Sequence, residues 1–450
     1  MRKIIQYMMM ALIAVVLASC ANDISEESTP TVKSNIRFVV DDFPMFEKPS
    51  TRTIGEEDKG KTAWAVGDEI CVKLESKELG TQTATLKYNG VKFEIQDGNS
   101  LCYLEGEPVT AYAYYAPNRR WLNDGNLGYK DGEHDGTAEF LEATCTVHYG
   151  DDNYVDISFA NATRNYSRLR IATIPKTEIK VDADNFAPTD NPNLLYMTYT
   201  LTSDEKGNAY LYGTFDNNSI VTVKYRGASL ATHKFSKRTE NAKSYALDAT
   251  VISANSAEEI KSAIEQKVAD GKTIIRLNLA PNAGTDEFMA IREAIKGAAP
   301  NDEGTIELTI IGVETIPEEA FKRMSQLKSV KMPDVKEIKK YAFSECRYLT
   351  VVEAPSLNKL NSGAFNECNL LSKLTFGPIN YADARYWPIF KDITPNIDLI
   401  LSDYQKEMIE TDDNLYTANN DIDYALSNEH RDKKFLGYEF KSITCRYKFE

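Results

Sequence analysis

Two cysteines each end a five-residue segment of the same pattern. Residues 342–346 and 364–368 both read Ala-Phe-x-x-Cys and place Cys346 and Cys368 one fixed interval apart. Two thiols at constant spacing could form a disulfide, bind a metal or supply a nucleophile. One interval earlier, however, the cysteine position is filled by Met324, so it requires a medium-sized apolar side chain rather than a thiol. We therefore predict that both cysteines pack in a core, although stacked neighbours roughly 5 Å apart are close enough for a disulfide.

The other cysteines form no recognisable chemical motif. There is no C-x-x-C pair and no dense disulfide framework. Buried free thiols are the favoured interpretation. The sequence leaves the thiol or disulfide state open at six positions: Cys71, Cys102, Cys145, Cys346, Cys368 and Cys445.

No known catalytic pattern is present. The chain has 4 histidines, none in a metal-binding spacing, and it lacks a G-x-S-x-G turn, a P-loop and a G-x-G-x-x-G loop. The Asp-rich stretches at 150–156 and 203–208 lack calcium-loop spacing and are more typical of turns. A pair of carboxylates for sugar hydrolysis is recognised by the distance between them in the fold, so its presence stays open at the level of sequence. We expect no enzyme, no metal and no cofactor.

Composition describes an ordinary globular protein of two to four domains. The chain has 450 residues, 42 % hydrophobic and 26 % charged. Because 52 basic residues stand against 67 acidic ones, the net charge is −15. No basic stripe interrupts this acidic balance, which argues against a nucleic-acid partner.

The first twenty residues have the pattern of an export signal. A basic start and a short apolar run, Met8–Leu17, precede Leu17-Ala18-Ser19-Cys20. The apolar run is much shorter than the roughly 20 residues of a membrane-spanning helix. The last four residues resemble a bacterial lipoprotein lipobox, which implies a signal peptide at 1–19 and lipidation of Cys20. The alternative is an ordinary secretory signal with an incidental cysteine.

Residues 20–34 are polar and acidic and are predicted to form a flexible tether. In lipoproteins of Bacteroides-like bacteria, acidic residues just after the lipidated cysteine often accompany display on the outer leaflet. The resemblance therefore implies a lipid-anchored protein of the outer membrane, exposed at the cell surface. Leaflet orientation is left open.

The stretch from Ile36 to Val251 is strand-like. Residues 85–95 alternate apolar and polar side chains on both sides of Asn89-Gly90, which predicts a hairpin with a two-residue turn. Many further short strands are separated by Gly, Asn, Asp and Pro. They predict two antiparallel β-sandwiches, at 35–145 and 146–252.

Helical spacing appears only after residue 253. Ser256-x-x-Glu259 predicts a helix start, and a second helix is expected at 286–296 between two strands. These elements, at 253–312, are expected to be the first turns of a solenoid. The tail at 378–450 is expected to cap its other end.

Between them, residues 313–377 contain three aligned turns of 22 residues with seven apolar columns. The columns are Ile316, Ala320, Phe321, Met324, Leu327, Val330 and Met332; then Ile338, Ala342, Phe343, Cys346, Leu349, Val352 and Ala354; then Leu360, Ala364, Phe365, Cys368, Leu371, Leu374 and Phe376. Constant spacing of this kind is typical of a solenoid whose turns stack on one another. We expect Phe321, Phe343 and Phe365 to form one buried row.

Two family resemblances follow from these residues. The repeat at 314–377 resembles the BspA-type leucine-rich repeat, which implies a short α/β solenoid, display at the cell surface and adhesion. The N-terminal half resembles the fimbrillin (Mfa-like) family in the order of five segments: NIRFVV, Thr51-Arg52-Thr53, WAVGDEI, AYAYYAP and ISFANATRNYSRLRIA. That likeness implies two transthyretin-like β-sandwich domains and a place among pilus subunits, pilus anchors or related adhesins. It also implies that Arg52 stands where a trypsin-like protease cleaves polymerising members.

A binding surface is expected on the outward side chains of the repeat strands. These are Ser329, Lys331, Val351, Glu353, Lys373 and Thr375. Their mixed charge indicates a protein or glycan partner on a host or bacterial surface; a plain solvated face is the alternative. We hypothesise a non-enzymatic surface adhesin. Two further hypotheses are a fimbrial anchor or tip subunit that accepts a donor strand from a pilus subunit, and a glycan-capturing accessory protein.

Overall fold

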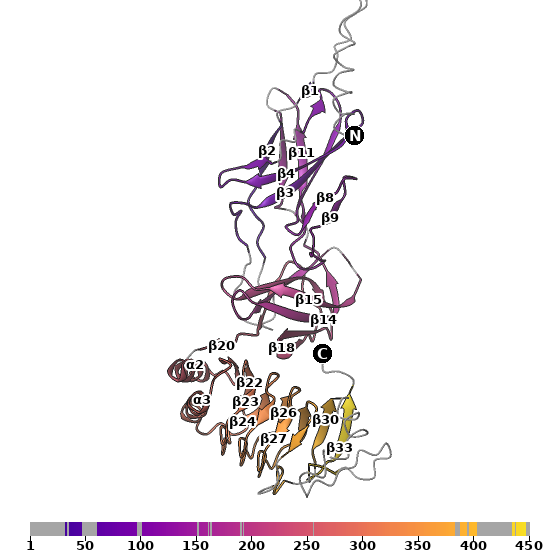
Figure 1. Ribbon diagram of the computed structural model, residues 1–450. Helices are drawn as coiled ribbons and strands as arrows, with labels where there is room; N and C mark the ends of the chain where they lie inside the picture. Colours follow the sequence, from indigo (N-terminus) through magenta and orange to yellow (C-terminus); the bar gives the residue numbers. More distant parts are fainter. Residues whose placement is uncertain are drawn as a thin grey trace, which may run out of the picture.

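The protein is built from three units joined end to end (Figure 1). The computed structural model describes residues 32–33, 36–46, 61–96, 101–150, 153–160, 162, 164–189, 191, 193–254, 256–382, 388–393, 396–402, 434–436 and 438–446. The described residues are mainly β-structure, with two helices. This agrees with the multidomain, mainly β architecture expected from the sequence.

The first unit packs a five-stranded sheet against a three-stranded one. The larger sheet has the order β10 (Leu141–Glu142), β7 (Val109–Tyr115), β3 (Glu69–Ser76), β4 (Gly80–Tyr88), β5 (Phe93–Ile95). The smaller sheet has the order β11 (Thr144–His148), β12 (Tyr154–Ser158), β2 (Arg37–Val40). Two short pairs flank them: β1 (Val32–Lys33) with β6 (Tyr103–Leu104), and β8 (Arg119–Trp121) with β9 (Leu127–Tyr129). Alternate residues of both sheets form one core, because successive side chains of a strand point to opposite faces.

The predicted hairpin is present between β4 and β5, but its loop is longer than expected. Tyr88 pairs with Phe93, so residues 89–92 form the connection. The Asn89 side chain accepts hydrogen bonds from the backbone of Val91 (2.9 Å) and Lys92 (3.0 Å). This side-chain turn holds the wider loop, because asparagine can replace a backbone acceptor locally.

The second unit is one seven-stranded sheet folded over into two layers. Its strands are β13 (Ser167–Ala172), β14 (Glu178–Pro188), β15 (Leu195–Thr202), β16 (Asn208–Phe215), β17 (Ile220–Tyr225), β18 (Ala228–Lys234) and β19 (Ser244–Asp248). The first part of β14 pairs with β15 and β17, and its end pairs with β16. A register shift between Ala183 and Phe186 allows β14 to pass from one layer to the other.

The first unit extends beyond the expected boundary at residue 145. Strand β12 pairs in parallel with β2 and antiparallel with β11, so residues 144–158 complete the first core. The second sheet begins only at Ser167. Local alternation indicates strands but not their long-range partners, so the expected boundary divided β11 and assigned β12 to the wrong unit.

The third unit is a parallel solenoid. Its main sheet has the order β20 (Ile252–Ser253), β21 (Ile274–Asn278), β22 (Ile306–Ile311), β24 (Leu327–Lys331), β26 (Val351–Ala354), β28 (Lys373–Phe376), β30 (Asp398–Ser402), β33 (Ser442–Arg446). A second parallel ladder joins β23 (Thr315–Ile316), β25 (Glu337–Ile338), β27 (Lys359–Leu360) and β29 (Tyr381–Ala382). The expected cap at 378–450 is therefore only partly a cap, since two of its strands continue the main sheet. A small pair, β31 (Lys434–Phe435) with β32 (Tyr438–Glu439), lies between them in sequence.

Two helices form the crossovers at the start of the solenoid. Helix α2 (Ala257–Ala269) begins at Ser256, whose side chain accepts a hydrogen bond from the backbone of Glu259. Helix α3 (Thr285–Ala298) buries Phe288, Ile291 and Ile295. Among the described residues, neither helix nor any other helix combines the length and apolarity needed to cross a membrane.

The units are joined by buried contacts. At the first joint, the linker residue Arg164 pairs with Glu139 and donates to the backbone oxygen of Pro44, and Phe46 packs against Tyr212 of β16. Between the second and third, the buried Arg276 donates to the backbone oxygen of Leu230, and Ile311 of the solenoid lies in the core of the second unit. Such contacts limit bending at both joints.

Candidate functional site

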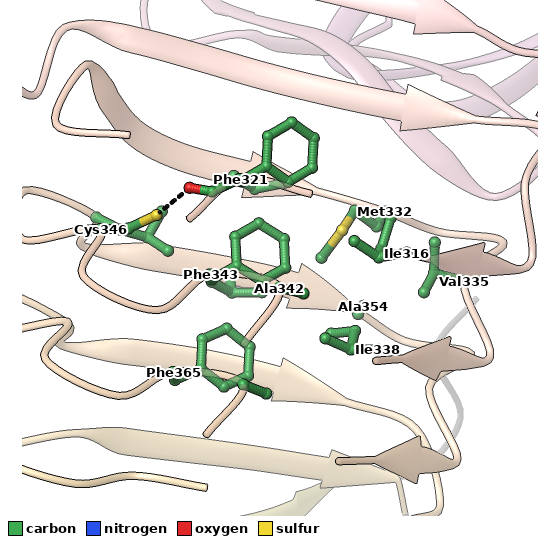
Figure 2. Close-up of a cluster of buried hydrophobic side chains, with 14 of the residues drawn as sticks. Ile316, Phe321, Met332, Val335, Ile338, Ala342, Phe343, Cys346, Ala354 and Phe365 are labelled. Atoms are coloured by element: carbon green, nitrogen blue, oxygen red, sulfur yellow. Dashed lines mark hydrogen bonds between the residues drawn. The ribbon is translucent and has the colours of Figure 1, made fainter. Parts of the chain in front are cut away.

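The repeat builds a continuous aromatic stack inside the solenoid. The rings of Phe321, Phe343 and Phe365 follow one another at 5.3 and 5.4 Å between centroids, and all three are fully buried (Figure 2). This confirms the predicted row. The aromatic column continues into parts without the repeat: Phe288 of α3 packs edge-on against Phe321 at one end, and Phe390 stacks on Phe365 at the other. It keeps the turns in register, because every turn packs on the same side chain of its neighbour.

The repeated cysteines are free, buried thiols that connect the turns. The Sγ atom of Cys346 lies 3.0 Å from the backbone oxygen of Phe321, and Sγ of Cys368 lies 3.1 Å from that of Phe343. Each thiol therefore donates to the turn before it, which the prediction of simple packing missed. Burial raises the pKa of Cys346 to about 12, so its thiolate is not available as a nucleophile at neutral pH.

The backbone repeats as strictly as the core. Two residues before each stacked ring, Glu319, Tyr341 and Gly363 all adopt positive φ, between 54° and 66°. The positions two residues after each ring do the same: Arg323, Glu345 and Glu367. Left-handed residues reverse the chain sharply on both sides of the ring. Because only one of these positions is glycine, the residue types alone do not predict this feature.

The six predicted surface residues lie together in two adjacent rows. One row aligns Ser329, Val351 and Lys373, and the other aligns Lys331, Glu353 and Thr375. All six are partly or fully exposed, while the residues between them are buried. Neighbouring strands are about 4.8 Å apart, so each row presents one side chain per turn at a constant interval.

Opposite charges alternate along this face and its edges. Lys331 and Glu353 approach to 3.6 Å, and Lys328 lies 2.7 Å from Glu307 one turn back. Exposed pairs of this kind contribute little stability, on the order of 0–1 kcal/mol. They leave a surface without a dominant sign.

The rows extend further than the sequence indicated. Asp398 of β30 stands next to Lys373, and the hydrogen bond from Ser442 of β33, with Lys441 and Lys373 nearby, lowers the pKa of the Asp398 carboxyl. At the other end, Arg276 and Thr309 belong to the second row but are buried, at 4 % and 5 % exposure. Arg276 contacts Leu230 of the second unit, so the second row becomes exposed only from Lys331 of β24 onward.

Several predicted positions cannot be placed at this face. Cys20, Arg52 and the side chain of Cys445 lie outside the described residues. Cys71, Cys102 and Cys145 are free thiols in the first unit. Within the part of the chain that the structure describes, no group of three His, Cys, Asp or Glu side chains could hold a metal ion.

Comparisons with known proteins locate the repeat. Residues 305–386 match the family model described as "BspA type Leucine rich repeat region (6 copies)", and the match extends beyond the expected 314–377 at both ends. No curated protein matches the chain.

Two solved structures share a distant likeness. One is a candidate cell adhesion protein of Bacteroides fragilis, with 10 % identity and a TM-score of 0.30, covering 48 % of this chain and 92 % of that chain. The other is a shaft pilin of Lactobacillus rhamnosus, with 12 % identity and a TM-score of 0.16, covering 41 % of this chain and 93 % of that chain.

Proposed function

We propose that this chain is a non-enzymatic cell-surface protein that binds protein or glycan ligands through the outer face of its repeat sheet. The observation that carries the proposal is the pair of aligned, exposed rows from Ser329 to Thr375, set on a fully buried stack. A surface held by a rigid core loses little conformational entropy on binding. The match to the BspA-type repeat supports the same reading.

The two N-terminal units serve as a stalk in this proposal. They separate the repeat face from β1, the first described strand, along the length of the molecule (Figure 1). Lipidation of Cys20 would anchor that end to the outer membrane and leave the solenoid outermost. Mass spectrometry of the mature N-terminus and protease shaving of intact cells test the anchor and the exposure separately.

An adhesion assay with matched variants tests the binding face. Beads coated with the full chain are applied to cultured epithelial cells and to bacterial cells. Exchanging Val351→Glu together with Lys373→Glu is expected to reduce attachment strongly, because both changes lie in the exposed row. The control exchanges Lys336→Glu and Lys359→Glu, two exposed residues beside the second ladder. Equal loss in both variants, or no loss in the first, would contradict the proposal.

A second candidate function, a fimbrial anchor or tip subunit, is favoured by one observation. Among the described strands, β2 lies at the edge of its sheet and pairs with β12 alone, while Ile36 and Phe38 beside and within it fill the core. Release of β2 after cleavage at Arg52 would open a groove for a donor strand. Copurification with a pilus subunit, abolished by Arg52→Ala, would support this function, whereas an unchanged pilus content would oppose it.

A further inference from the structure

A cavity of about 590 Å³ lies where the first and second units meet. Its lining comes from one face of strands β13 and β16, from the turn at 204–206 and from Lys61 of the first unit. Cavities of roughly 300–1,000 Å³ at the junction of two domains are the usual size and place of small-ligand sites.

The floor of the cavity is a patch of cross-strand arginine and tyrosine pairs. Arg168 stands opposite Tyr212, and Arg170 stands opposite Tyr210 on the neighbouring strand. The Arg168 guanidinium is buried, donates to the Ser244 side chain at 3.1 Å, and lies 5.0 Å from the centre of the Tyr210 ring. Packing on an aromatic ring fixes the plane of an arginine in advance of any ligand.

The charges in the cavity favour an anion. The two acidic residues of the lining already have partners: Asp204 accepts from the backbone of Lys206 and Asn208 at 2.8 Å, and Glu205 pairs with Lys176 at 2.8 Å. Lys61 is paired with Asp68. Lys206 is exposed, and no carboxylate of the described residues lies within ion-pair distance of it.

Arg170 contributes a second guanidinium, which donates to the Asn208 side chain at 3.3 Å. The tyrosine rings next to these cations offer flat apolar faces with polar hydroxyls. A ligand with a carboxylate on a compact, hydroxyl-rich ring would fit both the cations and the tyrosine rings. Guanidinium groups bind a carboxylate through two parallel hydrogen bonds, and an aromatic ring packs against the C–H face of a sugar.

We propose that this cavity binds a carboxylate-bearing saccharide, a uronic or sialic acid unit, with Arg168, Arg170 and Lys206 holding the carboxylate and Tyr210 and Tyr212 contacting the ring. The site lies in the stalk, is separate from the repeat face, and does not depend on the function proposed for that face.

Isothermal titration of the full chain tests the site with four defined sugars. Hyaluronan hexasaccharide and 3′-sialyllactose carry the two kinds of acid, and chitohexaose and lactose are their neutral counterparts. Binding of one acidic sugar and not the other identifies the source of the carboxylate. Hexaglutamate serves as a non-saccharide acid. We expect binding of an acidic sugar that weakens as salt is added, because ions screen charge attraction.

Three variants with the same change of charge locate the site. Arg170→Gln is expected to weaken binding about tenfold or more, and Lys206→Gln about two- to fivefold, since the arginine makes the paired hydrogen bonds. Lys237→Gln changes an exposed lysine elsewhere on the second unit and should leave affinity unchanged. Melting temperatures of all three verify the fold.

Several results would overturn the proposal. These are the absence of binding by both acidic sugars, equal binding of neutral sugars or hexaglutamate, and unchanged affinity in a folded Arg170→Gln variant. The repeat-face variant Val351→Glu with Lys373→Glu should bind the sugar normally, so failure here and failure of the adhesion proposal give different patterns.

Discussion

The rings of Phe343 and Phe365 lie 5.4 Å apart and within 5° of parallel, on consecutive turns of the solenoid. Each is fully buried and stacks on one ring above and one below. This relationship makes the aromatic column the element on which the order of the turns depends.

Phe343→Ala should remove the middle of that column. Truncating a fully buried phenylalanine typically costs about 3–5 kcal/mol, because the lost contacts are not recovered by collapse of the cavity. Chemical denaturation of the full chain measures the loss, with Phe343→Leu expected to lose clearly less. A loss below 1 kcal/mol for the alanine variant would contradict the importance of the stack.

The buried Cys346 thiol predicts a specific dependence on pH. Burial raises its pKa from the ordinary 9.0 to about 12. Between these values the unfolded chain loses the proton and the folded chain keeps it. The folded state then binds more protons, so the stability contributed by the thiol falls as pH rises, by about 1.4 kcal/mol per pH unit.

Comparison with Cys346→Ala isolates this contribution. The stability difference between the wild type and the variant should shrink from pH 8 to pH 10.5 in urea titrations. Met324→Ala, in the same column but without a titrating group, is the control, and its difference from the wild type should stay constant. Parallel behaviour of the two variants would show that the thiol does not titrate as described.

Arg164 and Glu139 form a buried ion pair at the joint between the first two units, each at 5 % exposure. Arg164→Met leaves the Glu139 carboxylate buried without its partner, which typically costs about 3–5 kcal/mol. Adding Glu139→Gln removes the stranded charge and should restore part of the loss. Calorimetry of both variants measures it, and a double variant as unstable as the single one would argue against this cause.

Gly363→Ala should destabilise the third turn. Gly363 has φ +66°, and an added Cβ would meet the Tyr341 ring at 2.4 Å. Strain and contact together predict a loss of about 1–3 kcal/mol. Glu319 occupies the equivalent position two repeats earlier and has φ 55°. Because glycine adopts positive φ without strain, Glu319→Gly should be neutral or stabilise the fold by up to about 1 kcal/mol. Thermal unfolding compares the two, and a harmless alanine would contradict the assigned backbone.

The sequence predicted the repeat well, for a clear physical reason. Burial in a solenoid recurs at a fixed interval, so Met324, Cys346 and Cys368 reveal their shared column by position alone. The outward rows follow from the same alternation. The function of the rows is a separate matter, since exposure is compatible with binding and with a plain solvated face.

Features without a fixed interval were not visible in the sequence. Phe288 and Phe390 join the aromatic stack from irregular spacings, and strands β30 and β33 continue the sheet where only a cap was expected. The sequence pattern also does not predict the cavity between the first two units. Its arginines and tyrosines come together only through the pairing of β13 with β16, which local patterns do not specify.

The parallel main sheet gives every turn the same hydrogen-bonding edge on both of its sides. A further 22-residue turn inserted between two existing turns would make the same strand pairing and the same core contacts with the turns on either side of it. Duplication of a short stretch of the gene could therefore lengthen the molecule by about 4.8 Å at a time without inventing a new contact. The length of the solenoid, and with it the distance that its far end extends, can therefore change by whole turns in evolution.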